Sequence, residues 1–259
     1  MGHTPTAVLL VLVVLLSMLL GVVGVALTQR LVPVERRKPH NAAMGIIYGG
    51  LYILFGVIVG FTSFLVLNNY NAARTTVQSE AADISRIYLL ARRLPESKRD
   101  EVQGLAESYA HVVLEKEWPL MRQSRTSPRA QALADELRGA IQGFKPTTSA
   151  QQTIYAQELS AVNDLDNDRA TRLLDMHPRL PPILWIALLG LTVPMLLFAW
   201  LMGIEDTSLH MWGVSALAAG VALVLFTIAV LDHPFGTDVR IGPQPFELVL
   251  HQIEGTGEQ

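Results

Sequence analysis

Cysteine is absent from this 259-residue sequence, and so are the short motifs that mark common catalytic sites. Without cysteine there are no disulfides, no thiolate nucleophiles and no cysteine-bound metals. The chain also has no glycine-rich phosphate loop, no His-Glu-x-x-His and no nucleophile elbow, and its seven histidines are dispersed. We therefore predict that the protein is not an enzyme and has no catalytic residue, no metal site and no cofactor.

Charge is scarce, at 17% of residues, whereas half of the residues are hydrophobic, a composition typical of a partly membrane-embedded chain. The net charge of −3 gives no reason to expect nucleic acid as a partner. The apolar residues gather in four long runs, each roughly 30 Å or more as a helix and so long enough to cross a bilayer, although Pro194 can kink the third. The runs are Ala7–Leu27, Gly45–Leu67, Ile183–Gly203 and Leu209–Leu231.

The interiors of these four runs contain no Asp, Glu, Lys, Arg or His. Proton pumps and ion-coupled carriers usually need such groups deep in the membrane. A channel does not, because a hydrophobic constriction can gate ion flow by excluding water. The absence therefore argues against a pump or a coupled carrier and is compatible with a channel.

The first run has a secretory signal peptide as its main alternative interpretation. Such a peptide has Lys or Arg before an apolar core of about 7 to 15 residues. Met1–Thr6 contains neither Lys nor Arg, and the apolar run that follows has 21 residues. We predict a retained membrane anchor.

The second run carries four glycines separated by four, seven and four residues, a spacing that places them on one helix face. In lipid, helices associate where small residues let their backbones approach closely. The face then packs either against the other three spans or against copies of itself around a pore. Its members are Gly45, Gly49, Gly56, Gly60 and Ser63, and the flanking candidates for a pore constriction are Tyr52, Ile53 and Phe64.

A basic connector, Thr28–Asn41, joins the first two runs, and Pro33 and Pro39 prevent it from forming one continuous helix. One interpretation is a topology signal. The other is attraction to anionic lipid headgroups, worth about 1 kcal/mol per basic residue. The basic residues of the connector are Arg30, Arg36, Arg37 and Lys38.

Residues 72–181 differ in composition, with fifteen basic and fifteen acidic residues and apolar positions at helical spacing. We predict a bundle of helices outside the membrane, separated from the second span by Asn68–Asn71, which are expected to satisfy helix-end carbonyls. Ser97, Ser127 and Thr148 are the predicted N-caps within the bundle.

The last two runs form a tight hairpin, because only Ile204–Ser208 lies between them. The sequence therefore predicts an all-α, polytopic membrane protein of four transmembrane helices, with a helical-bundle insertion between the second and third. Its parts are residues 1–71 (transmembrane helices 1 and 2 with the basic connector), 72–181 (bundle), 182–232 (transmembrane hairpin) and 233–259 (polar C-terminal tail).

Several stretches between Thr28 and about Ile241 occur in an order that indicates a known family. They are Tyr48-Gly49-Gly50, Asn71–Arg74, Gln78–Ala82 with Ile87-Tyr88, Glu117-Trp118-Pro119, Pro181–Trp185 and Leu231–Gly236. In these stretches the chain resembles the bestrophin-like membrane family of bacteria and plants, a domain of unknown function.

The resemblance implies a homo-oligomer, pentameric in bestrophins proper, with the second span around a central pore that passes inorganic ions. It also implies that the bundle and both termini lie in the cytoplasm. We predict an oligomeric ion channel of the cell membrane, in contact with the lipid bilayer and with copies of itself. The alternative is a non-conducting membrane scaffold or signalling subunit whose bundle binds a partner.

Overall fold

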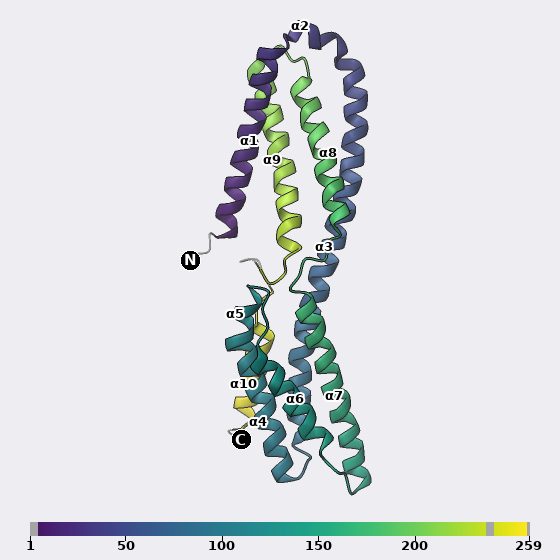
Figure 1. Ribbon diagram of the computed structural model, residues 1–259, viewed down its shortest axis with the longest axis vertical. Helices are drawn as coiled ribbons and strands as arrows, with labels where there is room; N and C mark the ends of the chain where they lie inside the picture. Colours follow the sequence, from purple (N-terminus) through teal and green to yellow (C-terminus); the bar gives the residue numbers. More distant parts are fainter. Residues whose placement is uncertain (1–4, 237–240, 258–259) are drawn as a thin grey trace. The chain divides into compact units, whose positions relative to one another are not determined.

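The computed structural model describes residues 5–236 and 241–257, and within these ranges every regular element is a helix (Figure 1). The helices are α1 (Thr6–Leu31), α2 (Val34–Arg37), α3 (Asn41–Ala91), α4 (Glu96–Val112), α5 (Trp118–Met121), α6 (Pro128–Gln142), α7 (Ser149–Leu174), α8 (Pro182–Leu201), α9 (Thr207–Leu231) and α10 (Gln244–Gly257), with a 3₁₀ turn at Lys38–His40 and a π-helical turn at Val113–Glu117. Four of them, α1, α3, α8 and α9, are long and apolar enough to cross a membrane. The predicted fold class, an all-α chain with four transmembrane helices, is confirmed.

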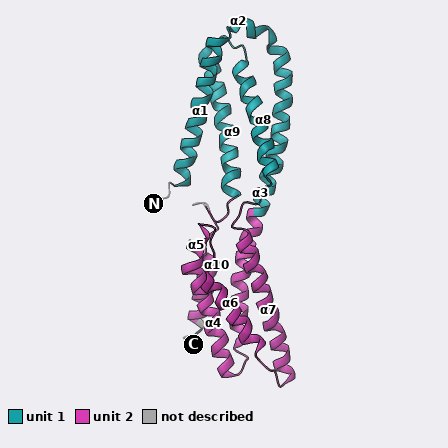
Figure 2. Ribbon diagram, in the orientation of Figure 1, with its two compact units in different colours: residues 1–69, 179–232 teal, residues 70–178, 233–259 magenta. Residues whose placement is uncertain are grey.

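The chain divides into two compact units, which Figure 2 shows in different colours. Unit 1 comprises residues 1–69 and 179–232, and unit 2 comprises residues 70–178 and 233–259. Unit 1 therefore contains the apolar runs, and unit 2 contains the predicted bundle together with the C-terminal segment.

Glycines allow close helix packing inside unit 1. A Cβ on Gly21 of α1 would lie 3.0 Å from the Cα of Ser215 on α9, and one on Gly24 would overlap the indole ring of Trp200. Apolar side chains, among them Leu188, Met195 and Ile228, fill the space between α3, α8 and α9. This is the packing expected in lipid, where small residues permit close backbone approach.

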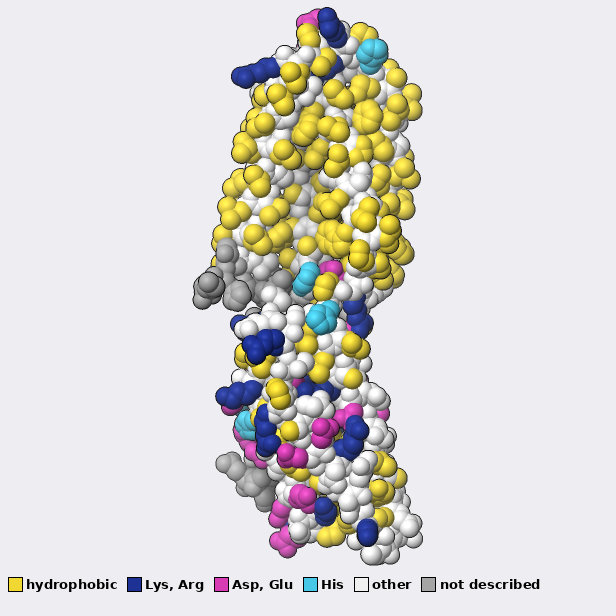
Figure 3. All heavy atoms as spheres, in the orientation of Figure 1, with side chains coloured by type: hydrophobic (Ala, Val, Ile, Leu, Met, Phe, Trp, Pro, Cys, Tyr) yellow, Lys and Arg dark blue, Asp and Glu magenta, His cyan; other side chains and the backbone are white. Residues whose placement is uncertain are grey.

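The exterior of unit 1 is apolar, as the yellow side chains of Figure 3 show on one face. Large hydrophobic side chains remain exposed on its helices, for example Leu16, Ile46 and Ile186 at 67%, 80% and 64%. An apolar surface of this extent would be unstable in water and suits contact with acyl chains.

Unit 2 is a helical bundle with its own hydrophobic core. The core side chains come from α3, α4, α6, α7 and α10, and they include Val77, Ile84, Tyr109, Leu137 and Leu165, each at most 1% exposed. These residues lie at the helical spacings that predicted a bundle, so the apolar periodicity of residues 72–181 corresponds to a real core.

Helix α3 is continuous for 51 residues and belongs to both units. The expected helix end at Asn68–Asn71 does not occur, since all four residues are helical. The chain has no proline between Pro39 and Pro95, so every backbone N–H in this stretch can continue the helical hydrogen-bond series. One element therefore leads directly from the membrane into the bundle.

Two of the three predicted N-caps are confirmed. The Ser127 hydroxyl accepts a hydrogen bond from the Ala130 N–H at 3.3 Å, and the Thr148 hydroxyl accepts one from the Gln151 N–H at 3.2 Å. The prediction for Ser97 was wrong, because the N-cap of α4 lies two residues earlier, at Pro95, and the helix has no side-chain cap. The fixed φ of proline sets the start of that helix instead.

The segment expected to be a polar tail contains α10. Its apolar residues recur at helical spacing, and Phe246, Val249, Leu250 and Ile253 are buried in the core of unit 2. The prediction missed this helix because the segment is short and polar residues surround its four core positions.

Candidate functional site

The four glycines on one face of α3 have open space around them within the described part of the protomer. A Cβ built on Gly45, Gly49, Gly56 or Gly60 would have no neighbour within 4 Å. This contrasts with Gly21 and Gly24 of α1, which pack against other helices of the same chain. The packed side of α3 is instead formed by residues such as Phe55, Thr62 and Val66, all buried. The four glycines are thus not explained by packing among the four spans of one chain.

The candidate constriction residues do not all share one environment. Ile53 and Phe64 point outward, with 70% and 64% of their surfaces exposed. Tyr52 is half-buried, and its ring makes an edge-to-face contact with Tyr48 at 4.7 Å between centroids. Ser63 is half-buried as well. Ile53 and Phe64 therefore lie on the outer surface of α3, while Tyr52 packs against its own protomer.

Two of the four basic connector residues make contacts inside unit 1. The buried Arg37 guanidinium donates to the carbonyls of Trp200 and Met202, at 3.1 and 3.0 Å, where α8 ends. Lys38 forms an ion pair with Glu205 in the turn between α8 and α9. Arg30 and Arg36 are exposed. Structural contacts thus account for half of the basic cluster.

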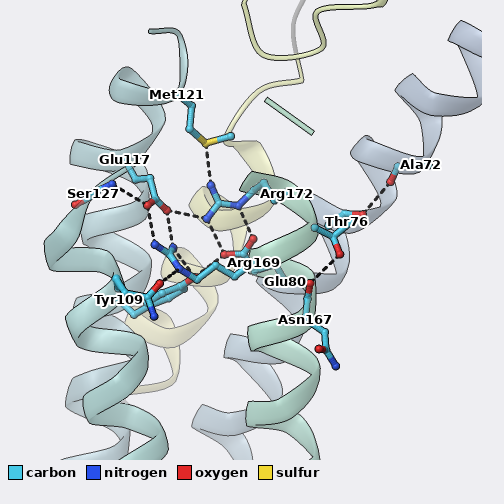
Figure 4. A network of polar contacts seen from close by, with 12 residues as sticks. Ala72, Thr76, Glu80, Tyr109, Glu117, Met121, Ser127, Asn167, Arg169 and Arg172 are labelled. Atoms are coloured by element: carbon cyan, nitrogen blue, oxygen red, sulfur yellow. Dashed lines mark hydrogen bonds and ion pairs between the residues drawn. The ribbon is translucent and has the colours of Figure 1, made fainter. Parts of the chain in front are cut away.

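A network of buried charges lies at the centre of unit 2 (Figure 4). Arg169 binds Glu117 through two hydrogen bonds of 2.6 and 2.8 Å. Arg172 bridges two carboxylates, with Nη2 at 2.9 Å from Glu80 Oε1 and at 2.8 Å from Glu117 Oε2. The Tyr109 hydroxyl donates to Glu80 at 2.5 Å. Two positive and two negative side chains, all at most 3% exposed, thereby neutralise one another.

The network determines the protonation of its members. Burial alone would raise the pKa of Glu117, but the hydrogen bond from Arg169 and the positive charges of Arg172 and Arg169 lower it below the usual value. Burial likewise opposes the charge on Arg172, yet Glu80 and the other partners raise its pKa. Glu117 and Arg172 therefore stay ionised in the interior. The network as a whole connects α3, α4 with its π-helical extension, and α7.

Sequence reasoning did not identify this network. Glu115 and Glu117 are two residues apart, a spacing that directs their side chains away from each other on a helix, so this stretch offered no reason to expect a charge network there. The structure has a π-helical turn there, with the Trp118 N–H donating to the carbonyl of Val113. Pro119 has no N–H to donate, which disrupts the α-helical hydrogen bonds. The proline directly after the Glu-Trp pair was a signal for the irregular helical turn, but not for the charge pairs that meet there.

Two of the motif stretches meet in unit 2. The Trp118 ring contacts Phe235 in a T-shaped arrangement at 6.0 Å and Phe246 of α10 at 5.9 Å, measured between ring centroids. The Arg172 guanidinium lies over the same ring, 5.5 Å from its centroid. The Glu-Trp-Pro stretch and the turn after α9 are therefore adjacent in the fold although they are far apart in the sequence.

A further carboxyl group is buried without a partner. Glu158 of α7 is 1% exposed, and neither of its oxygens has a hydrogen-bond partner among the described residues. Burial raises its pKa to about 8, with a smaller opposing effect of Arg86. Across residues 5–236 and 241–257, no three His, Cys, Asp or Glu side chains gather in a way that could hold a metal ion.

Comparison with known proteins identifies one family. The sequence profile of the Bestrophin-like domain matches residues 15–246, which is most of the chain and includes α3, α8, α9 and the larger part of α1. No curated protein matches the sequence.

Proposed function

Because this chain belongs to the Bestrophin-like family, we propose that it forms an ion channel from several copies, with the membrane part of α3 around a central ion path. The observation that carries the proposal is the open space beside Gly45, Gly49, Gly56 and Gly60 on one face of α3, since none of the described residues of the protomer lies next to them. Four glycines on one face of a membrane helix have no side chains with which to pack against lipid tails. They do allow the backbone of a second helix to approach closely.

The residues that flank the glycine face suit a hydrophobic gate. Ile53 and Phe64 project from the exposed side of α3, and the interior of this span carries no charge. In an assembly that turns this side inward, rings of these side chains would narrow the path, and an apolar constriction can stop ions by excluding water. We assign Ile53 and Phe64 to the constriction and give Tyr52 a packing role.

We also propose that the bundle and both termini lie on the cytoplasmic side. The basic connector is the main argument for the opposite orientation, but Arg37 and Lys38 are engaged with α8 and Glu205. Only Arg30 and Arg36 remain as a topology signal. Because the chain has no cysteine, a single Ser97→Cys variant tests this. An impermeant thiol reagent added to intact cells should not label it, and rapid labelling would reverse the orientation.

Planar-bilayer recording of the purified protein tests conduction, and mass measurement in detergent tests assembly. We expect a complex of several copies and a current in an anion or a cation gradient. Gly56→Leu and Gly60→Leu should break the complex and abolish the current. Gly220→Leu is a matched control, because this glycine of α9 also has open space around it but lies on another helix.

The outcomes separate the two functions. A monomeric protein would remove the central path and with it the channel. An intact complex with no current under either gradient would instead favour a non-conducting scaffold or signalling subunit that assembles through the same face.

A further inference from the structure

A pocket of about 410 Å³ opens in unit 2 between the bundle part of α3 and the first turns of α10. Tyr70, Arg74 and Gln78 form one wall, and their spacing of four residues places them on one face of α3. Gln244 and Leu248 of α10 lie on the opposite wall. None of these residues belongs to the buried charge network or to the glycine face.

The main polar group of the pocket, the Arg74 guanidinium, is available to bind a ligand. Arg74 is exposed and makes no ion pair or hydrogen bond with any other described residue, and none of the described residues that line the pocket is acidic. A guanidinium is always charged and presents a planar set of donors that matches phosphate and carboxylate oxygens. The carboxamides of Gln78 and Gln244 add further donors. The pocket therefore has the chemistry of an anion site.

Gly242 leaves room for the Gln244 side chain at one wall of this pocket. A Cβ at this position would overlap the carboxamide of Gln244, so the side chain can fold back over the backbone only because residue 242 is glycine. A larger residue would displace Gln244 from its position in the pocket. The sequence Gly-Pro-Gln-Pro at the start of α10 thus has a steric role in shaping the wall.

The position along α3 indicates the source of the anion. Tyr70 and Arg74 follow Leu67, the last residue of the apolar run, by three and seven residues, or roughly 5 and 10 Å along the helix axis. The headgroup region extends about 5 to 8 Å beyond the hydrocarbon core on each side. Tyrosine rings favour this level, and arginine side chains reach toward it. Leu248, 69% exposed, adds an apolar wall that suits the glycerol and acyl part of a lipid.

We propose that this pocket binds the phosphate of an anionic phospholipid, with Arg74 as the main contact and Gln78 and Gln244 as additional donors. A free phosphate ion has the same charged oxygens but no acyl chain. Contact with Leu248 should therefore contribute to the binding of a phospholipid and not to the binding of free phosphate. The proposal is independent of ion conduction.

The test is a lipid titration of the full-length, delipidated protein in detergent, followed by native mass spectrometry. The lipids are phosphatidylglycerol, which is anionic, and phosphatidylcholine, which is zwitterionic, and inorganic phosphate is added as a competitor. The variants are Arg74→Gln and Arg74→Lys, with Arg93→Gln as the matched control, since Arg93 is an exposed arginine in the turn after α3, outside the pocket.

We expect one phosphatidylglycerol per chain to bind more tightly than phosphatidylcholine. Arg74→Gln should weaken this binding at least tenfold, Arg74→Lys should retain part of it, and Arg93→Gln should leave it unchanged. Leu248→Gln alters an exposed side chain and leaves the core intact. It should weaken the binding of phosphatidylglycerol without changing any binding of inorganic phosphate.

Equal affinity of the wild type and Arg74→Gln for phosphatidylglycerol would overturn the proposal, and so would equal binding of the two lipids. Binding of inorganic phosphate that depends on Arg74, with no added affinity for the lipid, would support the phosphate site and reject the lipid as its source. Circular dichroism melting of each variant shows whether it is folded. If Arg74→Gln does not fold, Leu248→Gln and Gly242→Ala provide the same comparison.

Discussion

Replacing Glu158 by glutamine should make the stability of the bundle less dependent on pH. Glu158 is 1% exposed, and its two oxygens have no hydrogen-bond partner in the described part of the chain, so its ionised form is poorly solvated. Burial therefore raises its pKa to about 8, against about 4.3 for a glutamate in an unfolded chain. Between about pH 4.3 and pH 8, Glu158 therefore keeps its proton in the folded protein but has lost it in the unfolded protein.

The sign and size of the effect follow from linkage. Because the folded state binds more protons between these two pKa values, the free energy of unfolding falls as the pH rises from about 4 to about 8 and then levels off. The slope is about 1.4 kcal/mol per pH unit well below the folded pKa. Between pH 6 and pH 8 the loss from this one group is about 2 kcal/mol, since the slope decreases as the pKa is approached. Glu158→Gln removes this contribution.

Amide hydrogen exchange of α7 in the full-length protein measures the effect. After correction for the intrinsic exchange rate, the opening free energy of the wild type should fall by about 2 kcal/mol more than that of Glu158→Gln between pH 6 and pH 8. Glu136→Gln is the control, because Glu136 is an exposed glutamate of α6 that pairs with Arg129 at the surface. Parallel pH profiles of the wild type and Glu158→Gln would show that the carboxylate is ionised in the folded bundle and would refute this reasoning.

Three further substitutions test the contacts of the two units. Arg172→Met should destabilise unit 2 by about 3 to 5 kcal/mol in denaturant unfolding, because it leaves the buried Glu80 carboxylate without its arginine partner and Glu117 with Arg169 alone. A loss below about 1 kcal/mol would contradict this. Trp118→Leu removes the ring contact with Phe246 and should speed amide exchange in α10, whereas unchanged exchange there would show that the contact contributes nothing. Arg37→Ala removes two hydrogen bonds to the end of α8, so exchange near Met202 should rise while the bundle stays protected, and uniform protection would argue against the capping role.

Strong local patterns predicted much of the fold. The four apolar runs and the N-caps at Ser127 and Thr148 needed only composition and spacing, because lipid burial and capping act on residues near in sequence. The continuation of α3 through Asn68–Asn71 was missed, since asparagines suggest a helix end but do not force one. Helix α10 was missed because its four core positions are recognisable only against the bundle that buries them.

The glycine face and the buried charge network likewise differ in how far the sequence could predict them. The glycine face of α3 was predictable from spacing within one helix, and the structure adds that its four glycines have no neighbour among the described residues of their own chain. The buried charge network was not predictable, because it joins three helices and depends on a π-helical turn at Val113–Glu117; its members are Glu80, Glu117, Arg169 and Arg172. Residues separated by up to 92 positions meet there, and a single sequence contains no signal for that contact.

The most direct test of the channel proposal uses the absence of cysteine in the natural chain. A single Phe64→Cys variant is recorded in a planar bilayer before and after addition of a charged, water-soluble thiol reagent. If α3 lines the ion path, modification should change the current at once, whereas Leu189→Cys, an exposed position on α8, should give no change. An unchanged current after complete labelling of Phe64→Cys, or an equal response of Leu189→Cys, would contradict the placement of α3 at the centre of a channel.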